Sequence, residues 1–276
     1  MKVFHTCYYI NLERSKDRRE AMEKRFTNLK RVEGVDGRDL NIPKEILSRC
    51  KMNVFQIGCL QSHLKAIKTA YDNGDEEALI MEDDMRIDFI NKWEKSIEEI
   101  VRDKPNDAEC IILHCSGRKH ILKMLEMNCD YSPWIKGRYS TGCYYITRKG
   151  MEKIIKLGDN FIPKTYYPSD HLIYKLIKSY NYTKPLFNSL NIEKSLVINH
   201  SRVLNLMPVF RRYFDKINII NKLKNDNANK TKAFLVNLHK LKNEKNNIRK
   251  NLIRERIKVI LIKRKNNILR IRKIFK

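Results

Sequence analysis

Residues 78–84 read Ala-Leu-Ile-Met-Glu-Asp-Asp, and this stretch decides the class of fold that we expect. Its four apolar residues are typical of a short buried strand rather than of a helix. Three carboxylates, Glu82, Asp83 and Asp84, follow the strand without a break. Ligands of α/β proteins bind beyond the carboxyl ends of the strands, so acidic residues at this position predict a binding site.

The chain around this stretch alternates between strand and helix patterns as far as about residue 204. Strands are expected at Val3–Asn11, Lys30–Val35, Ala78–Met81, Cys110–His114, Tyr139–Thr147 and Leu196–Asn199. Helices are expected after the candidate N-cap Ser15, with Ala21, Met22, Phe26 and Leu29 at helical spacing, and at Gln56–Tyr71, Ile87–Val101, Arg148–Leu157 and Ser169–Tyr180. This alternation predicts an α/β fold with a mostly parallel sheet that is covered on both faces.

The acidic triplet has the chemistry of a metal site. Alternation along a strand would point Glu82 and Asp84 to one side and Asp83 to the other. Two convergent carboxylates suit a hard cation such as Mn²⁺ or Mg²⁺. Such a cation keeps open positions for phosphate oxygens and offsets the charge that builds on a diphosphate leaving group. An acidic first turn of a helix is the alternative, because Asp and Glu are favoured there.

The formal net charge of +25 comes mainly from the end of the chain. Residues 205–276 hold 22 Lys and Arg against 4 Asp and Glu. The basic character therefore does not identify the whole chain as a nucleic-acid-binding protein. We predict a catalytic domain over residues 1–204 and a basic, mainly helical extension over residues 205–276. The hydrophobic content of 42% supports a sizeable core and excludes a wholly disordered chain.

Cysteine usage and the apolar runs bear on the compartment. The seven cysteines are odd in number and include no Cys-x-x-Cys, which argues against a disulfide framework or a zinc ribbon. A reducing, cytoplasmic compartment is therefore expected. The sequence shows no apolar run of about 18 residues and no small-residue cleavage site near its start, so neither a spanning helix nor a secretory signal is expected. The glycine-rich motifs that most often bind phosphate are also missing.

Several separate blocks, in order and spacing, resemble glycosyltransferase family 25, which includes lipooligosaccharide and procollagen galactosyltransferases. The resemblance covers about residues 3–200. The blocks are Tyr9-Ile10-Asn11-Leu12-x-Arg14-x2-Asp17-Arg18-Arg19, Val35-Asp36-Gly37, Gly58-Cys59-x2-Ser62-His63, Leu79-Ile80-Met81-Glu82-Asp83-Asp84, the run Ser140–Gly150, and Pro168-Ser169-Asp170. The resemblance implies a GT-A nucleotide-sugar-binding fold, a UDP-sugar donor (usually UDP-galactose), a divalent metal and inversion at the anomeric carbon.

The resemblance also implies donor-binding roles for residues in these blocks. Asn11, Arg14 and Arg18 lie where a strand gives way to a helix, a place that suits uridine diphosphate. A solvated basic helix face is the alternative. Asp36 would contact the uridine ribose, although a plain turn fits the same residues. Asp83 is assigned to the donor side of the acidic triplet.

The later blocks imply further roles. His63 would bind the donor phosphate or hold the metal-site loop, with a hydrogen-bonded core histidine as the alternative. Gly142 would let the sugar approach the backbone, unless it only allows tight strand packing. Asp170 would take the proton of the acceptor hydroxyl, although an aspartate at a helix start is also ordinary. By analogy with other GT-A enzymes, His200 would complete the metal shell beside Glu82 and Asp84.

We therefore expect a metal-dependent inverting glycosyltransferase that uses Mn²⁺ or Mg²⁺. Its acceptor would be a hydroxyl group of a glycan, a lipooligosaccharide or a hydroxylysine-type side chain. A glycosidase would also use paired carboxylates, but they must flank the bond at roughly 5–10 Å, which a contiguous triplet fits poorly. A non-catalytic nucleic-acid- or membrane-binding protein on the same scaffold would explain the basic extension and leave the acidic triplet unused.

The basic extension carries a helical pattern of its own. Within Ile248–Phe275, apolar residues recur mostly at three- or four-residue steps with Lys and Arg between them. A basic amphipathic helix of this kind suits an anionic membrane surface or an acidic partner. Packing of the apolar stripe on the catalytic domain or on neighbouring helices is the alternative. Aromatic residues for base stacking are sparse, so we expect peripheral membrane association rather than nucleic-acid binding.

Overall fold

The computed structural model describes residues 4–115, 123–124, 127, 129–136, 140–184 and 186–189. The predicted strand Leu196–Asn199, the candidate ligand His200 and the extension 205–276 lie outside the described residues. Their predictions, and the predicted boundary near residue 204, therefore stay predictions. Within the described part of the chain, no helix is both long enough and apolar enough to cross a membrane.

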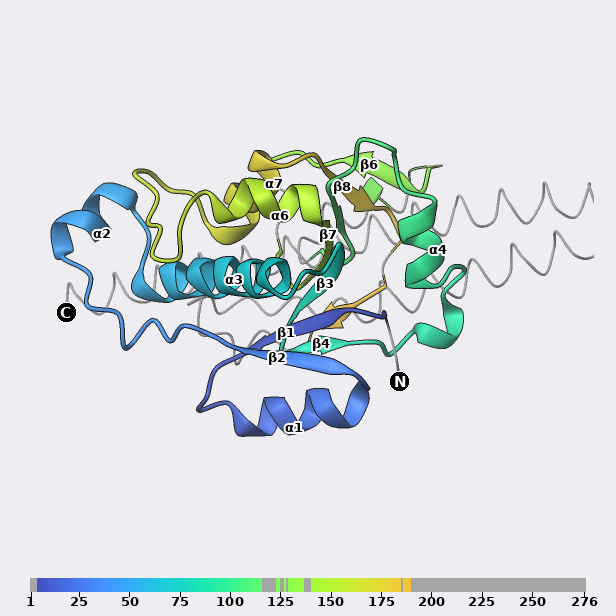
Figure 1. The fold of residues 1–276 in the computed structure, drawn as a ribbon, viewed down its shortest axis with the longest axis horizontal. Helices are drawn as coiled ribbons and strands as arrows, with labels where there is room; N and C mark the ends of the chain where they lie inside the picture. Colours follow the sequence, from blue (N-terminus) through green and yellow to red (C-terminus); the bar gives the residue numbers. More distant parts are fainter. Residues whose placement is uncertain are drawn as a thin grey trace, which may run out of the picture. The chain divides into compact units, whose positions relative to one another are not determined.

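A seven-stranded sheet forms the centre of the fold (Figure 1). Its strands are β1 (Cys7–Asn11), β2 (Leu29–Glu33), β3 (Glu77–Glu82), β5 (Cys110–Ile112), β6 (Tyr131–Pro133), β7 (Cys143–Thr147) and β8 (Ser179–Tyr182), in the spatial order β2-β1-β3-β7-β5-β8-β6. β1 pairs in parallel with β2 and β3, and β5 pairs in parallel with β8. β7 and β6 run in the direction opposite to the other five strands of this sheet. The prediction of a mostly parallel sheet is confirmed.

Helices cover both faces of this sheet, as the alternating pattern predicts (Figure 1). On one face lie α3 (Val54–Asp72), α6 (Arg148–Ile155) and α7 (Ser169–Leu176), and on the other lie α1 (Lys16–Arg25) and α4 (Ile97–Arg102). The alternation of β1 shows why both faces are covered. Its Tyr8 packs into the core under α3, whereas the adjacent Tyr9 packs into the core under α1 and α4.

The long helix α3 has a clear start and a clear buried face. Asn53 and Gln56 form a reciprocal capping box, in which each side chain accepts a hydrogen bond from the backbone N–H of the other. The box starts the helix slightly before the predicted Gln56. Leu60, Leu64 and Ile67 lie on its buried face, so hydrophobic burial against the sheet holds the helix in place.

Two predicted helices are shorter than the sequence pattern suggests. The predicted Ile87–Val101 is wrong as a single helix: the chain there forms a 3₁₀ turn η1 (Ile90–Lys92) and then α4, because a capping box at Ser96 starts a new helix. The predicted Ser169–Tyr180 ends at Leu176. The residues after it form β8 because they pair with β5 and β6, a contact that local periodicity does not encode.

Smaller differences concern element ends. Ser15 is the N-cap residue of α1 but makes no side-chain capping bond, and α1 ends before Phe26 and Leu29. The strands expected at Cys110–His114 and Tyr139–Thr147 are shorter in the described residues. Three further elements carry no strong local signal: α2 (Lys44–Cys50), β4 (Met85–Arg86) and β9 (Asn188–Ser189), the last two of which pair with each other.

Two glycines allow the loop after β2 to lie directly against α3. A Cβ atom on Gly58 would stand 2.8 Å from the Val35 carbonyl oxygen and 2.9 Å from the Gly37 nitrogen. A Cβ atom on Gly37 would stand 2.6 Å from the Val54 carbonyl oxygen. These are backbone atoms of packed elements, which cannot give way as a flexible side chain can. The two glycines therefore hold residues 35–37 near the carboxyl ends of β1 and β3.

Replacing Gly58 by alanine separates helix propensity from packing. Propensity alone would make Gly58→Ala more stable by about 1 kcal/mol. The added methyl group would instead clash with the backbone atoms of residues 35 and 37. We therefore expect a net loss of about 1–3 kcal/mol in the free energy of unfolding, measured in urea. Lys65→Ala, on the exposed face of the same helix, serves as the control. A Gly58→Ala chain that is more stable than the wild type would contradict this packing.

Candidate functional site

A cleft opens where the parallel strands β1, β2 and β3 end. It encloses about 130 Å³ between the loops that follow β1 and β2, the carboxyl end of β3 and the first half of α3. We call it the strand-end cleft; its lining residues are Ile10, Leu12, Arg14, Ser15, Arg18, Val35, Asp36, Gly37, Phe55, Cys59, Ser62, His63, Glu82, Asp83 and Asp84. Seven of the predicted site residues are among them. Asn11, Gly142 and Asp170 are not.

Asp83 is bound within the protein on both of its oxygens. Arg18 donates to Asp83 Oδ1 at 2.7 Å, and Asn11 Nδ2 donates to Asp83 Oδ2 at 2.8 Å. Asn11 itself is fully buried at the end of β1, where its Nδ2 also donates to the Ser15 carbonyl oxygen at 3.0 Å. These bonds join the end of β1, the start of α1 and the turn after β3 into one unit.

Glu82 is the last residue of β3 and faces a different set of partners. Its Oε1 accepts a hydrogen bond from the Thr141 hydroxyl at 2.8 Å and lies 3.4 Å from His63 Nε2. The other ring nitrogen of the buried His63 lies 3.1 Å from the Tyr144 hydroxyl. Burial by itself would raise the pKa of Glu82, but the hydrogen bond from His63 and its electrostatic attraction hold the pKa below its ordinary value. Glu82 is therefore an anion at the cleft.

Asp84 has an oxygen that nothing in the described part of the chain satisfies. Its Oδ1 is buried and has no hydrogen-bond partner there. Burial, followed by repulsion from Glu82, raises the pKa of Asp84 to about 7. A divalent cation would offset both the repulsion and the missing partner. Glu82 and Asp84 thus fit the predicted Mn²⁺ or Mg²⁺, and the third predicted ligand, His200, lies outside the described residues.

Asp36 holds an arginine in the lining of the same cleft. Arg14 Nε donates to Asp36 Oδ2 at 2.6 Å, and Arg38 contacts both carboxylate oxygens. The hydrogen bonds from Arg38 and Arg14 outweigh burial and hold the pKa of Asp36 well below its usual range. A ribose bound to Asp36, as the sequence predicts, would have to share the carboxylate with two guanidinium groups. In the structure, Asp36 positions Arg14.

A strained turn at Ser140 connects the acidic site with Asp170. Ser140 has φ of 139°, a region that favours glycine. Its backbone N–H donates to Asp170 Oδ2 at 3.1 Å, and its carbonyl oxygen accepts from the Tyr174 hydroxyl at 2.8 Å. Its hydroxyl lies 2.6 Å from His114 Nδ1. The next residue is Thr141, which binds Glu82, so the strained turn fixes one ligand of the candidate metal site.

Asp170 sits at the start of α7, as the sequence predicts for this residue. It is buried, and its second oxygen accepts from the backbone N–H of His171 at 2.9 Å. Burial raises the pKa of its carboxyl group despite these hydrogen bonds. The raised pKa suits a proton acceptor, whereas the two backbone bonds suit the ordinary helix-start role. Asp170 does not line the strand-end cleft.

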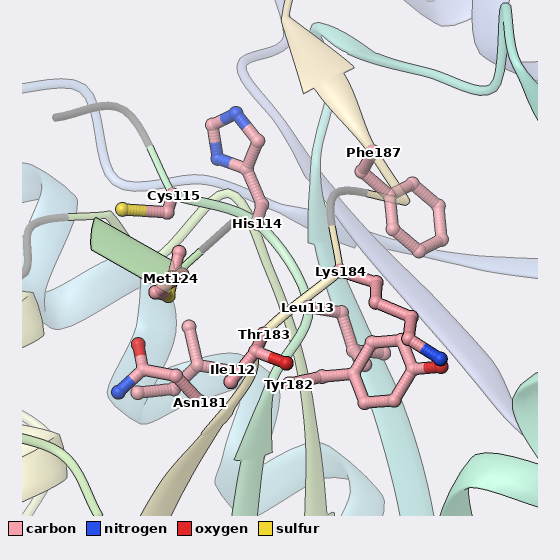
Figure 2. A pocket seen from close by; sticks show the side chains of 10 residues that line it. All are labelled: Ile112, Leu113, His114, Cys115, Met124, Asn181, Tyr182, Thr183, Lys184 and Phe187. Atoms are coloured by element: carbon pink, nitrogen blue, oxygen red, sulfur yellow. The ribbon is translucent and has the colours of Figure 1, made fainter. Parts of the chain in front are cut away.

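His114 is a site residue that sequence reasoning missed. A Cβ atom on Gly142 would stand 2.4 Å from His114 Nδ1 and 2.8 Å from Met85 Cε, so these side chains fill the space beside Gly142. That favours the packing interpretation of Gly142 over sugar contact. His114 also lines a second, smaller cavity together with Asn181 and Lys184 (Figure 2). The one available signal was its position directly after an apolar run, at the same sheet edge as the acidic triplet.

Comparisons with known proteins find relatives of the part of the chain that forms this site. Residues 4–173 match the family model described as glycosyltransferase family 25 (LPS biosynthesis protein). The chain is 30% identical over 203 residues to procollagen galactosyltransferase 2 of Mus musculus, covering 59% of this chain and 30% of that protein. The Homo sapiens protein of the same name is 30% identical over 200 residues, with the same coverage.

A more distant relative is procollagen galactosyltransferase 1 of Danio rerio, 25% identical over 201 residues, with 59% of this chain and 32% of that protein covered. The chain thus spans about a third of the length of these relatives. Among solved structures, a glycosyltransferase involved in the glycosylation of the major capsid of PBCV-1 aligns with a TM-score of 0.42 and 11% identity. That alignment covers 69% of this chain and 93% of the other, and it is too distant to bear on the site.

The buried His114 predicts a pH-dependent stability. Burial lowers the pKa of His114 to about 4, although the charge of Glu82 acts to raise it. The unfolded histidine has a pKa of about 6.5, so between these values the unfolded chain binds more protons and the fold weakens as pH falls. From pH 7 to pH 5 we expect this residue to cost on the order of 2 kcal/mol of the free energy of unfolding.

Urea unfolding at pH 5, 6 and 7 measures this effect. His114→Gln should show a flatter pH dependence than the wild type. His5→Gln, which alters an exposed histidine, is the matched control and should keep the wild-type slope. If His114→Gln retains the full slope, the acid sensitivity of the fold arises elsewhere.

Proposed function

The chain belongs to glycosyltransferase family 25, and we propose that it transfers a hexose, galactose in particular, from a UDP-sugar to an acceptor hydroxyl. We propose inversion at the anomeric carbon and the use of Mn²⁺ or Mg²⁺. One observation carries the proposal. Arg14, Arg18 and the start of α1, which we call the basic wall, line the same cleft as Glu82 and Asp84 at the carboxyl ends of parallel strands.

The donor diphosphate fits the basic wall. The first turn of α1 offers backbone N–H groups and the positive end of the helix dipole. Arg14 is oriented by Asp36 and keeps other guanidinium nitrogens for phosphate oxygens. Leu12, Val35 and Phe55 supply apolar surface in the same cleft, which suits the flat face of a uracil ring.

Glu82 and Asp84 are the residues that would hold the cation. When bound, the cation supplies positive charge at the diphosphate leaving group. Asp83 contributes indirectly, since its bonds to Arg18 and Asn11 set the direction of the turn that carries Asp84. His63 has the corresponding role for Glu82, with its second ring nitrogen placed against Tyr144.

The acceptor hydroxyl would attack the anomeric carbon from the face opposite the diphosphate. A new carbon–oxygen bond forms, the bond to the phosphate oxygen breaks, and UDP leaves with that electron pair. The hydroxyl proton needs an acceptor, and Asp170 is our proposed base because burial raises its pKa. Two lone-pair positions of its carboxylate are used by Ser140 and His171, which leaves others for a substrate proton.

The acceptor class and the place of action extend the proposal. The names of the curated relatives favour a procollagen-like protein acceptor, and the description of the family model favours a lipopolysaccharide acceptor. A glycolipid acceptor would suit an enzyme that binds an anionic membrane surface in the cytoplasm. The pattern of residues 205–276 supports such binding on sequence grounds.

Asp84→Asn tests the metal site. We expect the variant to fold and to lose transfer by about 100-fold or more, because an amide does not supply the anionic oxygen that a hard cation prefers. UDP release from UDP-galactose measures transfer, and Mn²⁺ titration calorimetry measures the metal directly. Asp39→Asn, on the exposed loop outside the cleft lining, is the control. Undiminished transfer by Asp84→Ala, or full activity in excess chelator, would exclude this role.

Asp170→Asn tests the base. Loss of a general base should lower turnover by about 10²–10⁴-fold and leave UDP affinity nearly unchanged. Ser140→Gly is the companion variant, because glycine adopts the strained φ and keeps the backbone N–H that Asp170 accepts. We expect Ser140→Gly to retain most of its turnover. A parallel collapse of UDP binding in Asp170→Asn would show that Asp170 acts by holding the turn.

A further inference from the structure

We propose that Cys59, His63 and Glu82 form a second metal site, for a thiophilic divalent ion such as Zn²⁺. The site opens into the strand-end cleft and shares Glu82 with the proposed Mn²⁺ or Mg²⁺ site. Its existence rests on geometry alone. Its effect on catalysis, described below, rests on the proposed function.

The three side chains converge from two elements. The sulfur of Cys59, a ring nitrogen of His63 and a carboxylate oxygen of Glu82 all lie within 4.8 Å of one another. Cys59 and His63 are four residues apart on α3, which places them on one face of the helix, and that face meets the carboxyl end of β3. Within the described ranges, no other three His, Cys, Asp or Glu side chains come together in this way.

The donor set selects the kind of metal. One sulfur, one imidazole nitrogen and one carboxylate oxygen are ligands that Zn²⁺ accepts in tetrahedral sites, whereas Mn²⁺ and Mg²⁺ prefer oxygen. Bond lengths of about 2.0–2.3 Å place the donors of a tetrahedral zinc site about 3–4 Å apart. His63 Nε2 and Glu82 Oε1 already stand 3.4 Å apart. The Cys59 sulfur lies within 4.8 Å of ligand atoms of both residues.

The surroundings of the three ligands match those of a metal site. His63 Nδ1 faces the Tyr144 hydroxyl at 3.1 Å, and an outer partner of this kind directs the opposite ring nitrogen towards a metal. Thr141 donates to Glu82 at 2.8 Å, and Ser169 Oγ lies 3.5 Å from the Cys59 sulfur. All three ligands line the cleft, so solvent can supply a fourth ligand.

The shared ligand predicts competition between the two metals. When Cys59 and His63 draw Glu82 to a thiophilic ion, Glu82 is no longer available beside Asp84. We therefore expect Zn²⁺ to inhibit the transfer that Mn²⁺ or Mg²⁺ supports. Cys59 alone distinguishes the two sites chemically, because a thiolate contributes to zinc affinity and little to that of a hard cation.

Cobalt binding tests the site directly. Co²⁺ replaces Zn²⁺ in such sites and gives a near-ultraviolet charge-transfer band when a thiolate binds it. We expect the full chain to show this band at one equivalent of Co²⁺ and to lose it when Zn²⁺ is added. Cys59→Ser should lack the band and bind Zn²⁺ at least about 100-fold more weakly. Cys129→Ser, which alters an exposed cysteine, should behave as the wild type.

The outcomes separate this proposal from the proposed function. Circular dichroism confirms that each variant is folded, and His63→Gln provides a second test that leaves every cysteine in place. Absence of the thiolate band in the wild type, or its persistence in Cys59→Ser, would overturn the site whether or not the chain is an active transferase. Binding through Cys59 without inhibition of UDP release would overturn the competition and leave the metal site intact.

Discussion

The candidate site depends on the carboxylate of Asp83, which Arg18 and Asn11 hold from two sides. This buried interaction ties the end of β1 and the start of α1 to the turn after β3. A buried carboxylate without partners would cost several kcal/mol, so the two donors and the acid require one another. With Asp83 committed to the protein, the turn has a set direction, and the acids on either side of it face the cleft.

The three carboxylates of the triplet consequently have three different electrostatic states. Asp83 is paired with a guanidinium and accepts a hydrogen bond from an amide, and Glu82 is stabilised as an anion by His63 and Thr141. Asp84 alone keeps a buried oxygen that no described residue satisfies. An unsatisfied oxygen on a buried carboxylate fits a ligand of a hard cation, which supports the proposed metal site. We propose that the basic wall of the same cleft binds an anionic ligand beside the cation.

Sequence patterns were sufficient for the α/β class and for one cluster of site residues. The apolar runs of β1 and β3 and the amphipathic pattern of α3 are local, and burial on both faces follows from them. Residues directly after β1 and β3 reach one edge because parallel strands end together, so Arg14, Arg18 and the acidic triplet were predictable as neighbours. The sequence of residues 169–180 does not predict that a helix ends there and β8 follows, because that strand forms only through its pairing with β5.

The roles within the site were decided by tertiary contacts. Gly142 was predicted either to let a sugar approach or to allow tight strand packing, and the side chains of His114 and Met85 lie beside it. His114, the strained Ser140 and Asp170 are up to 56 residues apart in the chain and meet only through the order of β7, β5 and α7. β3 ends at Glu82 and all three carboxylates line the cleft, so alternation along the strand did not tell which of them would find an arginine. The sequence by itself therefore determined which residue types reach this sheet edge, because that depends on local periodicity. Tertiary structure decided which of them are neutralised and which stay available, because that depends on partners distant in the chain.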